Sequence, residues 1–599
     1  MIVKMKKLTL LCTASQQEET LEKLRELEVV HVEHVQKPEG EAVDAARKKL
    51  QEVQRAKEIL QAQKSEAKAD APAKGDLVTA VLELLDREKE LKDQIQNLEH
   101  EHHRIAPFGD FDPASIQQLI ENGLFIKLYE VSKKAEPEVP EGVAIETIGE
   151  NKHNRYILAV SQADFSLSST EVALPEQSLS EVEQALESTK EALKKSEEEL
   201  ATQAVHLKQI EKIAEEHSDA LTYLEVQHGM GAEEVIVYLK GFYPAEREAD
   251  ILAAAQKNGW GYQLEEVADD DNPPTLLRNP KWVSPVKAVF QMIGVVPGYK
   301  ELDVSALFLI FLSIFFAFII GDAGYGLLFV GLTLFGKMKT KGNKSAQIPL
   351  NLMLLMSAFC VVFGALTGNY FGIPIESLPA PLKMLTNSYM TGWNGSAWDT
   401  DLAANHIMFI CFSIALVHLS IAHIWNIVRK INSPAALVDL GWLFCTWSLF
   451  TVVLNMVLYI TLPALVQTIQ LPLLGAGVLS IIIGLVLTKS YFGLVTLFLD
   501  VISNFVDIIS YVRLYAVGAA SLAIAQAFNG MAADIGFSGI GALGAAAILF
   551  AGHGLNIILG AMGVMVHGIR LNTLEFSSHA GVEWAGSPFN PFRKHKDEL

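Results

Sequence analysis

The chain has 599 residues, and its charge is spread very unevenly along its length. Residues 301–599 hold 13 Lys and Arg and 14 Asp and Glu, which leaves 48 − 13 = 35 and 69 − 14 = 55 for residues 1–300. An acidic half is therefore joined to a half that is almost free of charge and suited to a membrane. This excludes a purely soluble enzyme and, because nucleic acid requires a basic face, a nucleic-acid-binding protein.

The start of the chain and its cysteines give no sign of export. The segment Met1–Leu11 is too short, and too soon followed by charge, to be a signal peptide, so later apolar segments are expected to drive insertion and leave the N-terminal half in the cytoplasm. The cysteines are too far apart for a disulfide framework or a zinc site and are interpreted as small buried hydrophobic side chains. They are Cys12, Cys360, Cys411 and Cys445.

Three segments of the acidic half predict α/β lobes. Residues 1–40 contain KKLTLLCTA and VVHVEHV on either side of the helical segment EETLEKLREL, which predicts a strand, a helix and a strand. Residues 230–270 repeat this order, and the two segments are expected to form one proximal lobe. Residues 107–175, which include FIKLYEV and RYILAV, are expected to form a mixed distal lobe.

Two charged segments, residues 41–106 and 176–229, predict helical arms between the lobes, with a break at DAPAKGD in the first arm. Heptad spacing favours an antiparallel coiled coil, and about 45 helical residues would span roughly 70 Å, which is a strut. A solvated hairpin without a partner explains the periodicity equally well. No Walker-type loop is present, so no nucleotide site or cofactor is expected. The apolar positions are Leu50, Val53, Leu60, Leu77, Val81, Leu84, Leu91, Ile95, Leu98 and Ile105 in the first arm, and Val182, Leu186, Leu193, Leu200, Leu207, Ile210, Leu221 and Leu224 in the second.

Residues 291–599 predict an α-helical membrane domain with eight spans. The last two apolar runs exceed the roughly 20 residues that a bilayer requires, so they are expected to tilt or to lie partly in the interface. An even number of spans places both termini on one side. The runs are 303–320, 323–337, 349–372, 405–428, 435–461, 472–488, 493–533 and 540–577.

The positive charges between these runs set the expected orientation. Ten Lys and Arg residues follow even-numbered runs, and only Lys383 lies in a loop on the opposite side. The positive-inside rule therefore places the soluble half and the C-terminus in the cytoplasm. The terminal KDEL is accordingly treated as a coincidence rather than a retrieval signal. The ten residues are Lys337, Lys339, Lys341, Lys344, Arg429, Lys430, Lys489, Arg593, Lys594 and Lys596.

Arg513 and Arg570 lie deep within the two overlong runs and are the strongest chemical signal in the sequence. An arginine keeps its charge, and a charged side chain at the bilayer centre costs at least about 3 kcal/mol, so each needs a partner or an aqueous path. The alternative to a functional role is a structural arginine paired with a carboxylate of this chain.

The same two runs hold most of the remaining intramembrane polar groups. At 100° per residue, Asp500 and Asp507 share a face about 120–140° from Arg513, which favours a water path over a direct ion pair. The alternatives are that Asp500 is interfacial and that His553 and His567 are packing histidines. Four glycines predict close approach of another helix, interpreted as a moving partner. The other polar residues are Asn504, Ser521, Gln526, Asn556, Glu575 and His579, and the glycines are Gly518, Gly560, Gly563 and Gly568.

A family resemblance rests on an ordered set of motifs. The stretch DIISYVRLYAVGAA (507–520), which includes Ser510 and Tyr511, resembles the arginine span of the large stator subunit of V/A-type rotary ATPases, called subunit I in prokaryotes and subunit a in eukaryotes. The resemblance covers the whole chain. The other motifs, in order, are PPTLLRNPKWVSPVKAVFQMIGVVPGY (273–299), IIGDAGYG (319–326), FGALTGNYFG (363–372), VHGIRLNTLEF (566–576) and SPFNPF (587–592).

The resemblance implies that Arg513 is the essential gate and Arg570 its helper. Both would face the ion-binding carboxylates of a c/K-type rotor ring, which two offset half-channels reach from opposite sides. It also implies a non-catalytic subunit, with peripheral stalk subunits on the soluble arm, a central stalk cap subunit and the lipid bilayer as partners. ATP would be made or split in a separate head. The sequence leaves open whether the ion is a proton or sodium.

Two family positions differ in this chain. The eukaryotic pattern has a glutamate ten residues before the second arginine and a histidine eight residues after the first, where this chain has Gly560 and Ser521. Gln526, His553 and Asn556 are expected to take their place in the outer half-channel. The length and these patterns favour a prokaryotic enzyme. Asp322 is expected to cap a helix or to bind a loop at the outer surface, off the ion route.

Two other classes of protein were weighed. A self-contained secondary transporter commonly shows internal repeats and a site shared by two halves, and neither is evident here. A membrane-anchored scaffold would leave the two intramembrane arginines without a purpose.

Overall fold

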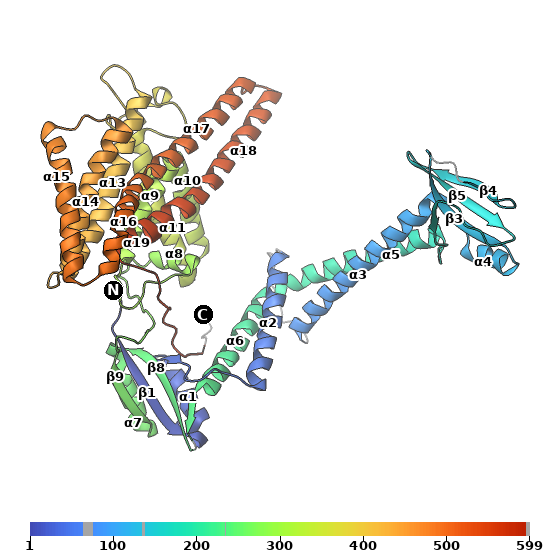
Figure 1. The fold of residues 1–599 in the computed structure, drawn as a ribbon, viewed down its shortest axis with the longest axis horizontal. Helices are drawn as coiled ribbons and strands as arrows, with labels where there is room; N and C mark the ends of the chain where they lie inside the picture. Colours follow the sequence, from blue (N-terminus) through green and yellow to red (C-terminus); the bar gives the residue numbers. More distant parts are fainter. Residues whose placement is uncertain (64–75, 135–137, 234, 595–599) are drawn as a thin grey trace. The chain divides into compact units, whose positions relative to one another are not determined.

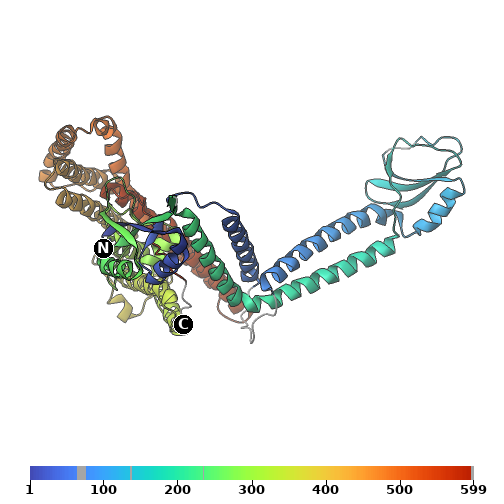
Figure 2. The same cartoon turned by 90° about the horizontal axis from the view of Figure 1, so that it is seen from below.

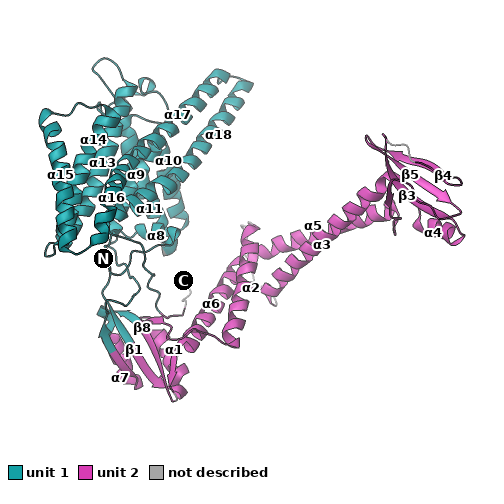
Figure 3. Ribbon diagram, viewed as in Figure 1, with its two compact units in different colours: residues 1–8, 242–249, 264–591 teal, residues 9–241, 250–263, 592–599 magenta. Residues whose placement is uncertain are grey.

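The computed structural model describes residues 1–63, 76–134, 138–233 and 235–594. The chain divides into two compact units (Figure 3). Unit 1 comprises residues 1–8, 242–249 and 264–591, and unit 2 comprises 9–241, 250–263 and 592–599. Most of the DAPAKGD segment and all of the terminal KDEL lie outside the described residues.

The proximal lobe contains both of the strand-helix-strand segments predicted from the sequence. Its sheet has the strand order β2-β8-β1-β9, with β7 paired to β8, so each segment supplies one inner strand and one edge strand. Burial alternates along β1 in its second half, as expected for a half-buried strand. The elements are β1 (Met5–Thr13), α1 (Gln17–Leu27), β2 (His31–Glu33), β7 (Gly231–Glu233), β8 (Ile236–Pro244), α7 (Glu248–Asn258) and β9 (Gly261–Glu266).

The distal lobe is a sheet with the strand order β4-β5-β3-β6, together with one helix. Strands β3 and β5 pair antiparallel over their full length, from Phe125 opposite Ser161 to Ser132 opposite Asn154. The mixed helix and strand content predicted for this segment is confirmed. The elements are α4 (Pro113–Glu121), β3 (Phe125–Ser132), β4 (Ala144–Glu150), β5 (Asn154–Ser161) and β6 (Thr170–Val172).

The predicted arms are paired helices (Figure 2). Helix α3 (Leu77–Ile105) packs along α5 (Leu179–Gln203), and α2 (Glu41–Ala62) packs along α6 (Leu207–Gly229). Apolar heptad positions form their shared core, including buried Val53, Leu60, Val81, Leu200 and Ile210. A short 3-10 turn at Ala204–His206 separates α5 from α6, so the second arm is not one continuous helix.

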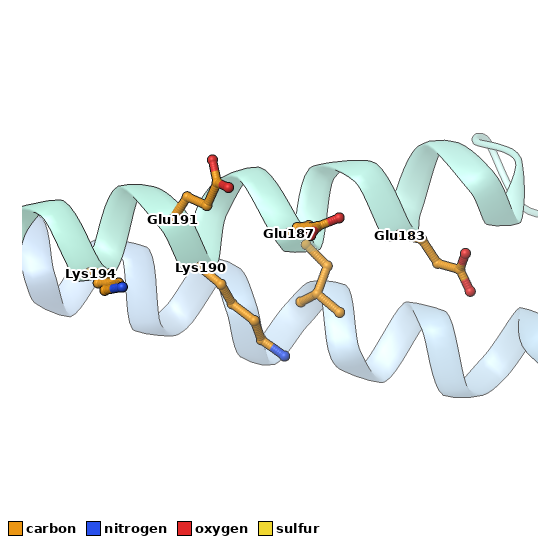
Figure 4. Close-up of a pocket in the computed structure, with 6 residues that line it drawn as sticks. Glu183, Glu187, Lys190, Glu191 and Lys194 are labelled. Carbon is orange, nitrogen blue, oxygen red and sulfur yellow. The ribbon is translucent and has the colours of Figure 1, made fainter.

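A shallow surface groove follows the pairing of α5 with α3 (Figure 4). Glu183, Glu187, Lys190, Glu191 and Lys194 line it, and Lys190 reaches across to Glu99 of α3 at 2.7 Å. These side chains form a solvated charged face of α5. Its exposed ion pair with α3 contributes little to stability, so the pairing of the two helices depends on their apolar contacts.

Each of the eight apolar runs contains a helix of the membrane unit (Figure 1). Within the described residues, six helical segments are long and apolar enough to cross a membrane, and α9 is a shorter apolar helix. The count of eight spans stays a prediction. The helices up to the last two runs are α8 (Val286–Ile293), α9 (Ser305–Ile320), α10 (Ala323–Lys339), α11 (Lys344–Thr367), α12 (Ala380–Lys383), α13 (Thr400–Arg429), α14 (Ala435–Leu458) and α15 (Ala464–Leu487).

Both overlong runs are interrupted. The first is divided at Tyr511 into α16 (Tyr491–Ser510) and α17 (Val512–Ile535). In the second, α18 (Ile540–Gly563) continues into two π-helical segments, η6 (Val564–Gly568) and η7 (Leu571–Phe576), and ends in α19 (Ser577–Ala580). Helices α17 and α18 lie side by side and run obliquely to α13 and α14 (Figure 1). These interruptions were not predicted from the sequence, which indicated only that the two runs are longer than a bilayer requires.

The four glycines singled out from the sequence, at positions 518, 560, 563 and 568, pack against α9 of the same chain. A Cβ on Gly518 would lie 2.4 Å from the carbonyl oxygen of Phe318, and one on Gly560 would lie 2.6 Å from Ile320. Gly563 and Gly568 also face Ile319. The predicted close approach of another helix is therefore confirmed, and that helix is α9 of the same chain.

Two smaller predictions are confirmed. Asp322 caps α10, where its carboxylate accepts a hydrogen bond from the amide of Tyr325 at 3.0 Å. All four cysteines are free and buried.

Candidate ion-translocation site

Arg513 and Arg570 converge on a single carboxylate, that of Glu575. A guanidinium nitrogen of Arg513 donates to Glu575 Oε1, and Arg570 Nε lies 3.5 Å from the same oxygen. The Glu575 side chain is only 3% exposed, whereas that of Arg570 is 53% exposed. The structure therefore contains the intrachain carboxylate that was weighed as the alternative to a functional role. Two arginines and one carboxylate leave a net charge of +1.

The π-helical turns explain why Arg570 and Glu575 face the same way. Residues five apart are separated by about 140° on an α-helix at 100° per residue, but a π-helix closes its hydrogen bonds between residues i and i+5. Arg570 lies between η6 and η7, and Glu575 lies within η7. Spacing alone, read as an α-helix, does not predict this shared face.

The backbone around Tyr511 positions the first arginine. Arg513 Nε donates to the carbonyl oxygen of Ser510 at 2.9 Å, in the turn that separates α16 from α17. Tyr511 is fully buried, and its hydroxyl group lies 2.8 Å from His418 Nδ1 on α13. These contacts hold Arg513 at the start of α17, pointing toward Glu575.

The acidic residues of α16 have separate surroundings. Asp507 lies 3.1 Å from His579 Nε2 and makes no ion pair with Arg513 within the described residues. Asp500 is exposed and accepts a hydrogen bond from Thr496 at 2.9 Å. Asn504 is buried against Thr446 of α14 at 3.1 Å, so it packs α16 on α14.

On the other side of Arg513, the predicted polar residues fall into two groups. Asn556 bonds to Ser521 on α17 and to the Tyr325 hydroxyl at 3.1 Å, and His553 lies 2.6 Å from that hydroxyl and 3.1 Å from Asn529. This network ties α17 and α18 to α10. His553 and Asn556 therefore have hydrogen-bond partners in Tyr325 and α17, and neither lines the cavity described next.

Gln526 belongs to the second group. It lines a cavity of about 500 Å³ that extends along α17 to Gly518 and Tyr515, two residues beyond Arg513. Asn369 and Glu376 supply further polar groups to the wall. His567 lies in η6, and its Nδ1 is buried without a hydrogen-bond partner among the described residues.

Several polar contacts of the site were missed by the sequence analysis, because they come from spans that it did not examine for polar groups. His418 and His423 on α13, and Tyr325 on α10, contact residues of the last two runs. The signal was available, since histidines inside an apolar run are uncommon. No group of three or more His, Cys, Asp or Glu that could hold a metal ion is present in the described part of the chain.

Comparison with known proteins gives the family. A search of protein-family models finds no match. The fold and the site define a membrane protein with several apolar helices, two arginines that share a buried carboxylate, and an α/β soluble region. The chain is 30% identical to V-type ATP synthase subunit I of Borreliella burgdorferi over 629 residues, covering 100% of both chains. It is also 28% identical to V-type ATP synthase subunit I 1 of Treponema pallidum, over 99% of this chain and 100% of that one. The chain belongs to the V-type ATP synthase subunit I family.

One solved structure is also similar. The crystal structure of the cytoplasmic N-terminal domain of subunit I, homolog of subunit a, of V-ATPase matches 43% of this chain and 99% of that chain. The identity is 13% and the TM-score is 0.21, which are too low to support a conclusion about this chain.

Proposed function

We propose that this chain is the membrane stator subunit of a V/A-type rotary ATPase, in which it guides ions to and from a rotor ring. The observation that carries the proposal is the cluster of Arg513, Arg570 and Glu575. Its excess of one positive charge, held inside a helical unit, is suited to bind one further carboxylate.

In this proposal, the further carboxylate belongs to a subunit of the rotor ring. Fixed positive charge in a low-dielectric contact stabilises the deprotonated carboxylate and so expels its ion. Arg513 is then the gate that blocks a direct leak, and Arg570, which is more exposed, is its helper. Moving one charge across a membrane potential of 100 mV is worth about 2.3 kcal/mol. Several ions per turn of the rotor can therefore be coupled to ATP synthesis or hydrolysis in a separate catalytic head.

The access routes follow from the polar residues on either side of Arg513. Gln526 and the cavity beside it are the outer route. On the inner side, Asp507 and Asp500 line the approach, with Ser510 and Tyr511 at the turn. His567 lies beside the helper arginine. His553 and Asn556 hold the outer ends of α17 and α18 together, which is a change from their expected role on the route itself.

The larger arrangement is part of the same proposal. Residues 291–599 form the membrane domain with eight spans, and residues 1–290 form a cytoplasmic arm with an antiparallel coiled coil. The arm resists torque by binding peripheral stalk subunits, and a central stalk cap subunit is a further partner. The positive-inside rule supports cytoplasmic placement of the arm and the C-terminus.

The test is ATP-driven ion uptake by vesicles that carry the whole complex, with Arg513→Ala compared with wild type. Loss of uptake in a complex that still assembles would support the stator function. Normal uptake would make Arg513 structural and overturn the proposal. A secondary transporter, by contrast, would move its solute without a copurifying ring.

A further inference from the structure

A chain of buried side chains connects Asp507 with the loop between α13 and α14. His579 Nε2 lies 3.1 Å from Asp507 Oδ2, and His579 Nδ1 lies 3.0 Å from His423 Nε2. On the far side of that ring, His423 Nδ1 lies 3.9 Å from Asp439 Oδ1. Four titratable side chains therefore form a line, and each comes from a different helix: α16, α19, α13 and α14.

Both ends of this line have some access to solvent, because the Asp507 side chain is 18% exposed and Asp439 pairs with an exposed lysine. Asp439 is 9% exposed, but Lys430, whose Nζ lies 2.8 Å from Asp439 Oδ2, is 43% exposed. Asn426 donates to Asp439 and also to the carbonyl oxygen of His579 at 3.0 Å, which holds both ends of the histidine pair in place. Solvent therefore reaches the Lys430 end, and the other end is Asp507, six residues before Arg513.

Hydrogen-bond roles along the line show that it lacks one proton. The Asp507 carboxylate can only accept, so His579 Nε2 donates to it. In the neutral ring, His579 Nδ1 is then an acceptor for the His423 Nε2 proton. His423 Nδ1 is consequently a second acceptor, and it is buried with no hydrogen-bond partner in the described part of the chain. A proton placed on this nitrogen would point toward Asp439 Oδ1, which at 3.9 Å lies beyond hydrogen-bond distance, so the Asp439 step requires a small side-chain movement.

We propose that Asp439, His423 and His579 form a proton relay that supplies Asp507, and that the coupling ion is therefore a proton. This inference rests on the proposed stator function and assigns the ion that it leaves open. Sodium is excluded from this route because a hard cation requires oxygen ligands, whereas the middle of the relay is a contact between two imidazole nitrogens.

In one transfer from the Lys430 end toward the rotor ring, every proton that a group gains is matched by one that it loses. A proton from solvent binds the Asp439 carboxylate. Once the 3.9 Å gap between them closes, the Asp439 O–H bond breaks and that proton binds His423 Nδ1, while the His423 Nε2 proton passes to His579 Nδ1. The His579 Nε2 proton then passes to the Asp507 carboxylate, which becomes a carboxylic acid and releases the proton toward the rotor-ring carboxylate. One proton enters, one leaves and no electrons are transferred. Each imidazole ring then carries its proton on its other nitrogen, and the ring must rotate before the next transfer.

Other charged groups adjoin the relay without joining it. Glu575 and Arg513 pair with each other. His418, five residues before His423 on α13, bonds to the Tyr511 hydroxyl instead. These groups therefore do not branch the relay.

The first experiment uses the wild-type complex in proteoliposomes and measures ATP-driven uptake of protons and of radioactive sodium. We expect proton uptake that does not require sodium and no sodium uptake when a protonophore is present. Sodium uptake that persists with the protonophore would overturn the relay, whatever the variants show.

The second experiment compares His579→Gln and His423→Gln with His406→Gln, a histidine that stacks on Tyr389 away from the relay. Each relay variant is expected to lower proton uptake at least about tenfold. A positioned proton-transfer group typically speeds its reaction by about 100-fold or more, so this threshold is a low one. His406→Gln should retain normal uptake. Added imidazole should partly restore uptake in His579→Gly, which a purely structural role would not produce.

Two further variants keep the outcome interpretable. If a histidine variant does not assemble, Asp439→Asn removes the entrance carboxylate with little change of shape, and normal uptake in that variant would overturn the relay. Arg513→Ala is measured in the same preparations. If it abolishes uptake while the histidine variants transport normally, the relay is wrong and the stator function stands. If Arg513→Ala transports normally, the stator function itself fails.

Discussion

Arg513 and Glu575 form an ion pair between two separate apolar runs, and Arg570 approaches the same carboxylate oxygen at 3.5 Å. Removing one partner of a buried ion pair leaves an uncompensated charge, which is far more costly than the pair itself. Glu575 therefore sets both the position and the net charge of the arginine cluster.

Glu575→Gln is expected to keep the shape of the cluster but to raise its net charge from +1 to +2. The rotor carboxylate would then be held too tightly to be released, so ATP-driven ion uptake should fall several-fold while the complex still assembles. Glu583→Gln, at an exposed position eight residues further on, is the matched control. Equal uptake by the two variants would show that Glu575 does not tune the arginines.

Gly518→Ala is expected to destabilise the membrane unit by about 1–3 kcal/mol, as overpacking of a filled contact does. The new methyl group would lie 2.4 Å from the carbonyl oxygen of Phe318, and a backbone atom cannot move aside easily. Gly530→Ala on the same helix is the control, because nothing lies within 4 Å of its Cβ position. Thermal unfolding of the purified chain measures both, and equal midpoints would contradict the packing of α17 on α9.

The sequence predicted the helices and strands of this chain well wherever local periodicity determines them. The alternation in β1 and the heptads of α3 and α5 each fix a face without reference to the rest of the molecule. The same approach failed at η6 and η7, because a π-turn depends on packing around the helix and leaves no periodic signal of its own. Once the turn is present, Arg570 and Glu575 share a face that the α-helical calculation separates.

Contacts between distant segments could not be predicted from the sequence either. The glycines at 518 and 560 indicated that a helix comes close, but the sequence could not show that this helix is α9. His423 and His579 are 156 residues apart, and no spacing rule joins them. The two arginines were found because an intramembrane charge is unusual in itself, whereas their shared carboxylate required the fold.

An ion pair in the soluble part of unit 1 gives a pH-dependent contribution to stability. Lys7 Nζ lies 2.6 Å from Asp271 Oδ1, and this hydrogen bond, together with one from the amide of Ala268, lowers the pKa of Asp271 below its ordinary value of 3.8. A lowered carboxyl pKa adds stability above the ordinary value, and this is lost as the pH falls through the lowered one.

Asp271→Asn should therefore be less stable than wild type at pH 7, and the difference between the two should close below about pH 4. Thermal unfolding of the purified full chain across this range measures the difference. Asp269→Asn, at an exposed neighbouring position, should track wild type throughout. A gap between Asp271→Asn and wild type that widens toward acid pH would contradict the assignment.

Gln526 and His553 allow the outer route to be tested against the helix network. Gln526 lines the cavity that extends toward Tyr515, so Gln526→Leu should lower ATP-driven ion uptake several-fold by removing a polar group from the path, with little change in unfolding temperature. His553 bonds to Tyr325 and Asn529, so His553→Leu should leave buried polar groups unpaired and lower stability by about 1–3 kcal/mol. Its uptake per assembled complex should stay close to wild type. If the two phenotypes are exchanged, the outer route follows His553 and Asn556 along α18 without Gln526, and the cavity beside α17 is only a packing defect.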